Sequence, residues 1–212
     1  MKLKTLTFGV ILLGTMAAVG AQAPAGQAPA GQAPGGRAGG GEGRRGGGRG
    51  PQGPGLALTT ASFQDGGEIP AKYVGAMGVS PKLDWANVPM GTVTFALIMH
   101  DPDVALQRKL DDVLHWMAFN IAGTARSLDG GIPEGASAAS GMIQAKNLKG
   151  APGYMGPGNA AINPYHHYTF ELYALDTKLA LGADATRADV LKAMEGHIIG
   201  KAVLFGRFKR PQ

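Results

Sequence analysis

Beyond residue 56 the chain alternates short apolar runs with segments rich in Gly, Pro, Asn and Asp. Residues 92–100 (TVTFALIMH) and 113–121 (VLHWMAFNI) are rich in β-branched, aromatic and other apolar residues, which occupy successive positions. Because neighbouring side chains of a strand point to opposite faces, such runs predict strands that are covered on both sides. We therefore expect both runs to be inner strands of a sheet.

Two further runs predict strands, and one segment predicts a helix. Residues 166–175 (HHYTFELYAL) alternate, so that His166, Tyr168 and the apolar residues at the next even positions share one face. Residues 201–208 (KAVLFGRF) predict a closing strand. The helix is expected after Thr186, an N-cap residue followed three positions later by an acidic residue and then by apolar residues at helical spacing. Because strands dominate, the sequence favours an antiparallel β-sandwich with one or two short helices.

The first 55 residues differ in composition from the rest. Residues 1–23 contain two Lys, then an apolar run, then Ala-Gln-Ala, which is the pattern of a secretory signal peptide with its cleavage site. Residues 24–55 consist largely of Gly, Pro, Ala, Gln and Arg, which bury too little apolar surface to fold and predict a disordered linker. We expect a folded domain at 56–212, exported to the periplasm or secreted. The chain has no Cys, so no disulfide supports this domain.

The basic charge of the chain lies in its N-terminal part. The whole chain has a net charge of +5, whereas residues 56–212 contain 14 Lys and Arg against 14 Asp and Glu. A neutral domain has no general attraction for a polyanion, so we expect no specific binding of nucleic acid. The arginines of the 24–55 segment predict at most a weak, salt-sensitive contact with an anionic membrane.

Recognisable catalytic motifs are absent from the sequence, which has no Cys nucleophile, no Gly-x-Ser-x-Gly elbow and no phosphate-binding glycine loop before a helix. Instead, polar residues interrupt the apolar strands. Asp101 follows the first run, His115 lies within the second, and His166 and Tyr168 begin the third. Burying such groups without partners costs several kcal/mol, so they should pair with one another or meet a ligand.

The same segments carry a family resemblance. FALIMHDPD, LHWMAFNIAG, GYMGP, HHYTFELYALD and GHIIGKAVLFGRF resemble motifs of the phosphatidylethanolamine-binding protein family in their order and spacing, and are most similar to its bacterial Raf-kinase-inhibitor-like branch. The resemblance covers residues 56–210. It implies a β-sandwich with a small pocket that accepts phosphate-like groups. Carried over residue by residue, it places Asp101, His115, Gly156, Pro157, His166 and Tyr168 at this pocket.

Two of the chain's departures from the family pattern lie in the predicted pocket loop and beside His166. After Gly156 and Pro157 it continues Gly-Asn-Ala-Ala, where the family has Cys or a Pro-rich stretch. His167 stands where the family has an arginine between the second histidine and the tyrosine. Both differences bear on the wall of the pocket and on its preference among anions.

The leading hypothesis is an exported, non-enzymatic binding protein whose pocket takes a small anionic or phosphorylated ligand without a cofactor or metal. Imidazole, phenol hydroxyl and backbone N–H groups all donate to anionic oxygens. One alternative is a metal-dependent hydrolase, in which Asp101, His115 and His166 hold a catalytic metal. Another is an extracytoplasmic interaction or inhibitor module, in which the sandwich presents a loop to a protein partner.

Overall fold

The computed structural model describes residues 54–105, 111–135, 137, 140–158 and 164–211 of the chain. Within them, nine strands form two sheets, accompanied by one α-helix and one 3-10 helix. The predicted signal peptide and the predicted linker up to residue 53 lie outside the described residues, and both stay predictions. In the described part of the chain, no helix is long and apolar enough to cross a membrane.

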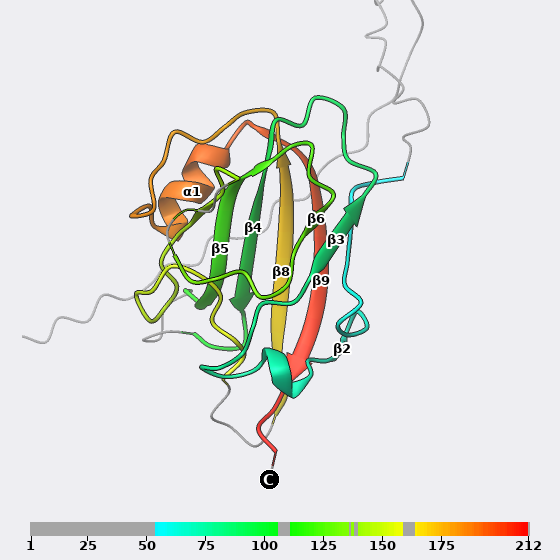
Figure 1. Cartoon of the computed structure of the whole chain (residues 1–212), viewed down its shortest axis with the longest axis vertical. Helices are drawn as coiled ribbons and strands as arrows, with labels where there is room; N and C mark the ends of the chain where they lie inside the picture. Colours follow the sequence, from blue (N-terminus) through cyan, green and yellow to red (C-terminus); the bar gives the residue numbers. More distant parts are fainter. Residues whose placement is uncertain (1–53, 106–110, 136, 138–139, 159–163, 212) are drawn as a thin grey trace, which may run out of the picture. The chain divides into compact units, whose positions relative to one another are not determined.

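A six-stranded sheet and a three-stranded sheet pack against each other (Figure 1). The larger has the order β2 (Gly67–Glu68), β9 (Ile198–Phe208), β8 (His166–Leu175), β4 (Thr94–Asp101), β5 (Val113–Ala122) and β7 (Ile143–Gln144). The smaller has the order β1 (Ala57–Thr59), β3 (Leu83–Ala86) and β6 (Ser127–Leu128). The described pairs are antiparallel except for the short parallel contact of β2 with β9. The predicted antiparallel β-sandwich is thereby confirmed.

The main core lies between the two sheets, and a second cluster lies on the outer face of the large sheet. In the main core, Trp85 of β3 meets Phe95 of β4 with ring centroids 5.3 Å apart. On the outer face, α1 (Arg187–Met194) packs Val190 and Met194 onto apolar residues of β4, β5 and β8 (Figure 1). β4 and β5 are therefore covered on both sides, as their uninterrupted apolar runs predicted.

The start of α1 follows the predicted capping pattern. The Thr186 hydroxyl accepts the backbone N–H of Asp189 at 3.2 Å, and the Asp189 carboxylate accepts the backbone N–H of Thr186 at 2.9 Å. These reciprocal bonds satisfy two amides that a helix start otherwise leaves without partners. After Met194, Gly196 adopts a φ of 80°, a left-handed conformation that glycine tolerates and that ends the helix. A 3-10 helix, η1 (Ala71–Tyr73), lies earlier in the chain.

The pairing of β4 with β5 contains a β-bulge at His115. Met99 pairs with Trp116, but the next residue, His100, pairs with Leu114. His115 is therefore the extra residue on the bulged strand. Bulges of this kind re-aim a side chain, and they recur beside functional sites.

Candidate ligand-binding site

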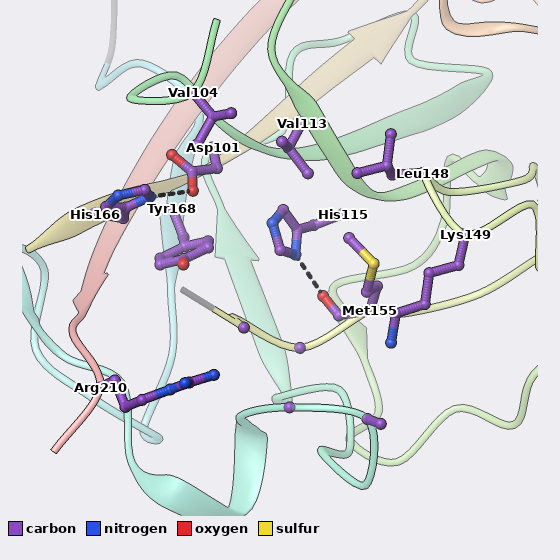
Figure 2. Close-up of a pocket in the computed structure, with 14 residues that line it drawn as sticks. Asp101, Val104, Val113, His115, Leu148, Lys149, Met155, His166, Tyr168 and Arg210 are labelled. Atoms are coloured by element: carbon purple, nitrogen blue, oxygen red, sulfur yellow. Dashed lines mark hydrogen bonds and ion pairs between the residues drawn. The ribbon is translucent and has the colours of Figure 1, made fainter. Parts of the chain in front are cut away.

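Five of the six predicted site residues line one cavity of about 650 Å³ at one end of the large sheet. The antiparallel pairing explains their convergence, because the end of β4 lies beside the start of β5 and near the start of β8. Figure 2 shows the side chains of four of them, Asp101, His115, His166 and Tyr168, around the same space. The five residues are Asp101, His115, Gly156, His166 and Tyr168. That they bind a ligand stays a prediction.

Asp101 and His166 form a carboxylate–imidazole pair on one side of the cavity (Figure 2). Oδ2 of Asp101 lies 2.8 Å from Nδ1 of His166, and Oδ1 accepts the backbone N–H of Asp103 at 3.0 Å. The carboxylate accepts, so Nδ1 of His166 carries the hydrogen and Nε2 is the ring nitrogen left for a ligand. Because Asp101 is only 3% exposed, its position is fixed, and it fixes the imidazole in turn.

His115 faces the cavity because of the β-bulge. Regular alternation would direct it to the face opposite Trp116, but the extra residue lets both side chains face inward. Nδ1 of His115 donates to the carbonyl of Met155 at 2.7 Å, and the ring meets that of Tyr168 edge to face with centroids 5.1 Å apart. Burial lowers the pKa of His115 below its ordinary value, against the smaller opposing effects of the bond to Met155 and of nearby Asp101.

The loop that contains Gly156 forms another wall of the cavity and closely approaches the end of η1 and the residues that follow it. A Cβ atom on Gly156 would lie 2.6 Å from the carbonyl oxygen of Tyr73 and 2.8 Å from that of Gly75, closer than atoms can pack. Two hydrogen bonds join the segments: Gly75 N–H donates to the carbonyl of Pro157 and the Tyr154 hydroxyl donates to that of Tyr73, each at 2.8 Å. The close packing of this cavity wall therefore requires glycine at position 156.

Of the six predicted site residues, Pro157 alone does not line the cavity. It is buried, and its carbonyl is engaged by Gly75. Pro157 braces the loop and does not face the space that a ligand would fill. The resemblance placed both loop residues at the pocket, and only the structure separates the lining glycine from the supporting proline.

His167, another departure from the family pattern, also lies outside the cavity lining. Its backbone N–H and its Nδ1 both approach Oδ2 of Asp103, at 2.6 and 2.9 Å. Burial raises the pKa of Asp103, but the hydrogen bonds from His167 outweigh burial and hold the pKa below its ordinary value. The contact ties the start of β8, which carries His166, to the segment directly after Asp101, the last residue of β4.

Two cationic residues that the sequence reasoning missed also line the cavity. Lys149 and Arg210 reach it from separate segments, and Figure 2 shows them on different sides of the space. Arg210 follows β9, whose Phe208 pairs with His166, so the pairing of two predicted strands would have placed it near the site. Lys149 lies in a turn, and no sequence signal marks it. Apolar walls come from Val104, Val113, Leu148 and Met155.

The hydrolase alternative required a metal held by Asp101, His115 and His166. Among the described residues, no three His, Cys, Asp or Glu side chains form a group that suits a metal ion. The structure therefore offers no support for the metal-dependent alternative.

Fold and cavity together define a class of protein: a small β-sandwich whose large sheet ends in a cavity with two histidines, a buried carboxylate and a close-packed glycine loop. The sequence profile of the phosphatidylethanolamine-binding protein family matches residues 59–209. The chain belongs to this family, which confirms the resemblance seen in its motifs. It is accordingly a binding protein of this type.

Relatives and solved structures agree with this assignment. A UPF0098 protein of Methanothermobacter thermautotrophicus is 39% identical over 156 residues, which are 73% of this chain and 99% of the relative. The putative phosphatidylethanolamine-binding protein homologue CT736 of Chlamydia trachomatis is 33% identical with a TM-score of 0.64, and the match covers 74% of this chain and 99% of CT736. YbcL of Escherichia coli is 25% identical with a TM-score of 0.65 over the same shares. The likeness therefore extends over the whole fold.

Proposed function

We propose that this protein is exported and that its cavity binds a small anionic ligand, such as a phosphorylated group, without catalysing a reaction on it. The observation that carries the proposal is the meeting of two cationic side chains with two oriented imidazoles in one cavity. Lys149 and Arg210 supply positive charge, and His115 and His166 each have one ring nitrogen held by a protein partner. Such groups are suited to the oxygens of an anion.

The size and walls of the cavity favour an organic anion over a bare inorganic one. A volume of about 650 Å³ lies in the range of cavities that hold small organic ligands. The apolar side chains of Val104, Val113, Leu148 and Met155 line it beside the polar groups. A phosphate ester with a compact apolar substituent satisfies both kinds of surface.

The lining residues also favour binding over catalysis. Among the described residues that line the cavity, there is no Ser, Thr or Cys to act as a nucleophile. Asp101 is no free base, because both of its oxygens already accept hydrogen bonds. We therefore expect phenyl phosphate to bind without release of phenol, and steady phenol release by the pure protein would contradict this part of the proposal.

Ligand binding is tested by calorimetric titration with phenyl phosphate, with uncharged benzyl alcohol as the control ligand. We expect binding of one phenyl phosphate per chain and far weaker binding of benzyl alcohol. His166→Ala should abolish binding. His197→Ala is a matched control, because Nδ1 of His197 also lies 2.8 Å from a carboxylate, that of Asp176, but outside the cavity lining. Equal binding by the two variants would overturn the proposed site.

Export rests on the signal-peptide pattern of residues 1–23. The test is expression of the full chain, followed by cell fractionation and N-terminal sequencing of the recovered protein. We expect a mature chain that begins at residue 24 and is recovered outside the cytoplasm. A cytoplasmic protein that retains Met1 would overturn this part of the proposal.

A further inference from the structure

We infer that the cavity prefers a phosphate monoester to a phosphate diester, because His115 offers a hydrogen-bond acceptor and only the monoester keeps a P–OH group to donate to it. The inference rests on the proposed anion-binding function and specifies its ligand class. It follows from the hydrogen bonds of one imidazole.

The tautomer of His115 is set by the backbone. Nδ1 lies 2.7 Å from the carbonyl oxygen of Met155, and a carbonyl oxygen only accepts, so Nδ1 carries a hydrogen. In the neutral ring Nε2 then has a lone pair and no hydrogen. No described residue hydrogen-bonds to Nε2. Figure 2 shows this nitrogen on the side of the ring that faces Asp101 and Tyr168, away from Met155.

The charge state of His115 follows from the groups around it. Burial is the largest influence, and it lowers the pKa. Asp101 of β4 raises the pKa of His115, whereas Lys149 of the facing turn and His100 of β4 lower it further. From β8, Tyr168 presents its ring, while His166 is paired with Asp101, and Arg210 lines the cavity beyond them. The balance keeps His115 neutral at neutral pH, so its Nε2 accepts.

The other polar groups of the cavity serve the ionised oxygens of the ligand. Lys149 and Arg210 only donate. The imidazole of His166 is held by the carboxylate of Asp101 at 2.8 Å, whereas His115 has a neutral carbonyl for a partner. The cavity thus combines donors for P–O⁻ with an acceptor for P–OH.

A phosphate monoester in its monoanionic form carries both kinds of oxygen, whereas a diester carries none with a hydrogen. When a diester is bound, Nε2 of His115 therefore faces the lone pair of an oxygen, or else the imidazole must take up a proton. Burial of the ring disfavours that proton. An unmade hydrogen bond to a buried group reduces affinity by about tenfold or more. Because the second pKa of a phosphate monoester is about 6, the monoanion falls about fiftyfold in population between pH 6 and pH 8.

The test is calorimetric titration of the full-length protein with phenyl phosphate and methyl phenyl phosphate. At pH 6, where half of the monoester has the same single charge as the diester, we expect the monoester to bind about tenfold tighter or more. Its affinity should fall by up to about fiftyfold at pH 8, with uptake of one proton. Equal affinities at pH 6 would overturn the inference and leave anion binding intact, whereas failure of both ligands to bind would overturn the proposed function as well.

Two further measurements address His115 itself. Nitrogen NMR of the wild-type complex with phenyl phosphate should show a neutral ring with hydrogen on Nδ1, and a doubly protonated ring would overturn the inference. In His115→Gln the amide offers both a donor and an acceptor, so the preference for the monoester should shrink toward parity. If that variant does not fold, the NMR result on the wild-type protein decides the matter alone.

A vesicle experiment distinguishes a soluble ester from a lipid with the same headgroup chemistry. Phosphatidic acid carries a phosphate monoester and phosphatidylglycerol a diester. If phenyl phosphate releases the protein from phosphatidic acid vesicles, the cavity takes a lipid monoester. If the protein binds phenyl phosphate in solution but phenyl phosphate does not release it from the vesicles, the cavity takes soluble monoesters. If the protein also binds phosphatidylglycerol vesicles, and phenyl phosphate reverses that binding, the preference for a monoester over a diester would be overturned.

Discussion

His115 and Met155 hold each other through two hydrogen bonds. The ring Nδ1 of His115 donates to the Met155 carbonyl at 2.7 Å, and the Met155 N–H donates to the His115 carbonyl at 2.9 Å. The pair joins the bulged start of β5 to the loop that contains Gly156. These two hydrogen bonds therefore fix the position of the loop, the position of the His115 ring and the tautomer of that ring. The chemistry of the cavity and the geometry of its wall are thereby coupled.

Stability should depend on pH through His115. Its folded-state pKa lies below the unfolded value of about 6.5, so the unfolded chain binds a proton that the folded chain refuses. The free energy of unfolding should therefore fall as the pH drops through about 6.5 toward the folded-state pKa, by about 1.4 kcal/mol for each unit between the two values. Urea unfolding at pH 7.5 and pH 5 measures the fall. His115→Gln should show a smaller fall than wild type, and equal falls would contradict the assignment.

Gly156→Ala should both destabilise the protein and weaken ligand binding. The added Cβ would meet the carbonyl oxygens of Tyr73 and Gly75 at 2.6 and 2.8 Å, so the loop must move and strain its bond to Gly75. We expect a loss of about 1–3 kcal/mol in the free energy of unfolding, as for other overpacked sites. Gly158→Ala is the matched control, because its Cβ would have no neighbour closer than 3.8 Å. Similar losses in both variants would show that the close approach is not the cause.

Much of the fold could be predicted because its strands have simple patterns. The alternation of β8 placed Tyr168 on the inner face, and the structure buries it there. The apolar runs of β4 and β5 predicted strands that are covered on both sides, and the capping pattern at Thr186 predicted α1. In each case the signal is local, because side-chain periodicity and capping depend on residues a few positions apart.

The details of the site depend on contacts between distant segments, and sequence patterns do not record these. The inward orientation of His115 results from a bulge in the pairing with β4, and regular alternation would direct the side chain outward. Lys149 reaches the cavity from a turn that has no periodicity to interpret. Arg210 was within reach of prediction only through the pairing of β8 with β9. Pro157 lies beside a lining residue and yet does not line the cavity.

Asn120→Ala should destabilise the domain without affecting the cavity. Asn120 has a φ of 57°, and its amide accepts the N–H of Leu179 at 2.9 Å and donates to the carbonyl of Leu179 at 3.0 Å. The variant leaves two buried backbone groups without partners and keeps the left-handed strain, so we expect a loss of about 2–4 kcal/mol in the free energy of unfolding.

Asn120→Gly separates the two causes of that loss. Glycine tolerates the positive φ but makes neither side-chain hydrogen bond, so any stability that it recovers relative to Asn120→Ala measures the backbone strain. Urea unfolding measures stability, and titration with phenyl phosphate should show unchanged affinity in whichever variants fold. A change in affinity would mean that this part of β5 is coupled to the cavity.

Removing the positive charges at the cavity should weaken phenyl phosphate binding in a salt-dependent way. Both Lys149 and Arg210 are exposed, so water screens their charges, and Lys149→Gln and Arg210→Gln should each reduce affinity by only about twofold to fivefold. The reductions should shrink as salt is raised from 0.02 to about 0.5 M, because the screening length falls well below about 10 Å. Lys146→Gln is the control, since Lys146 pairs with Asp184 at 3.0 Å and does not line the cavity. Losses equal to that of the control, or losses that salt leaves unchanged, would mean that the two cations do not face the bound anion.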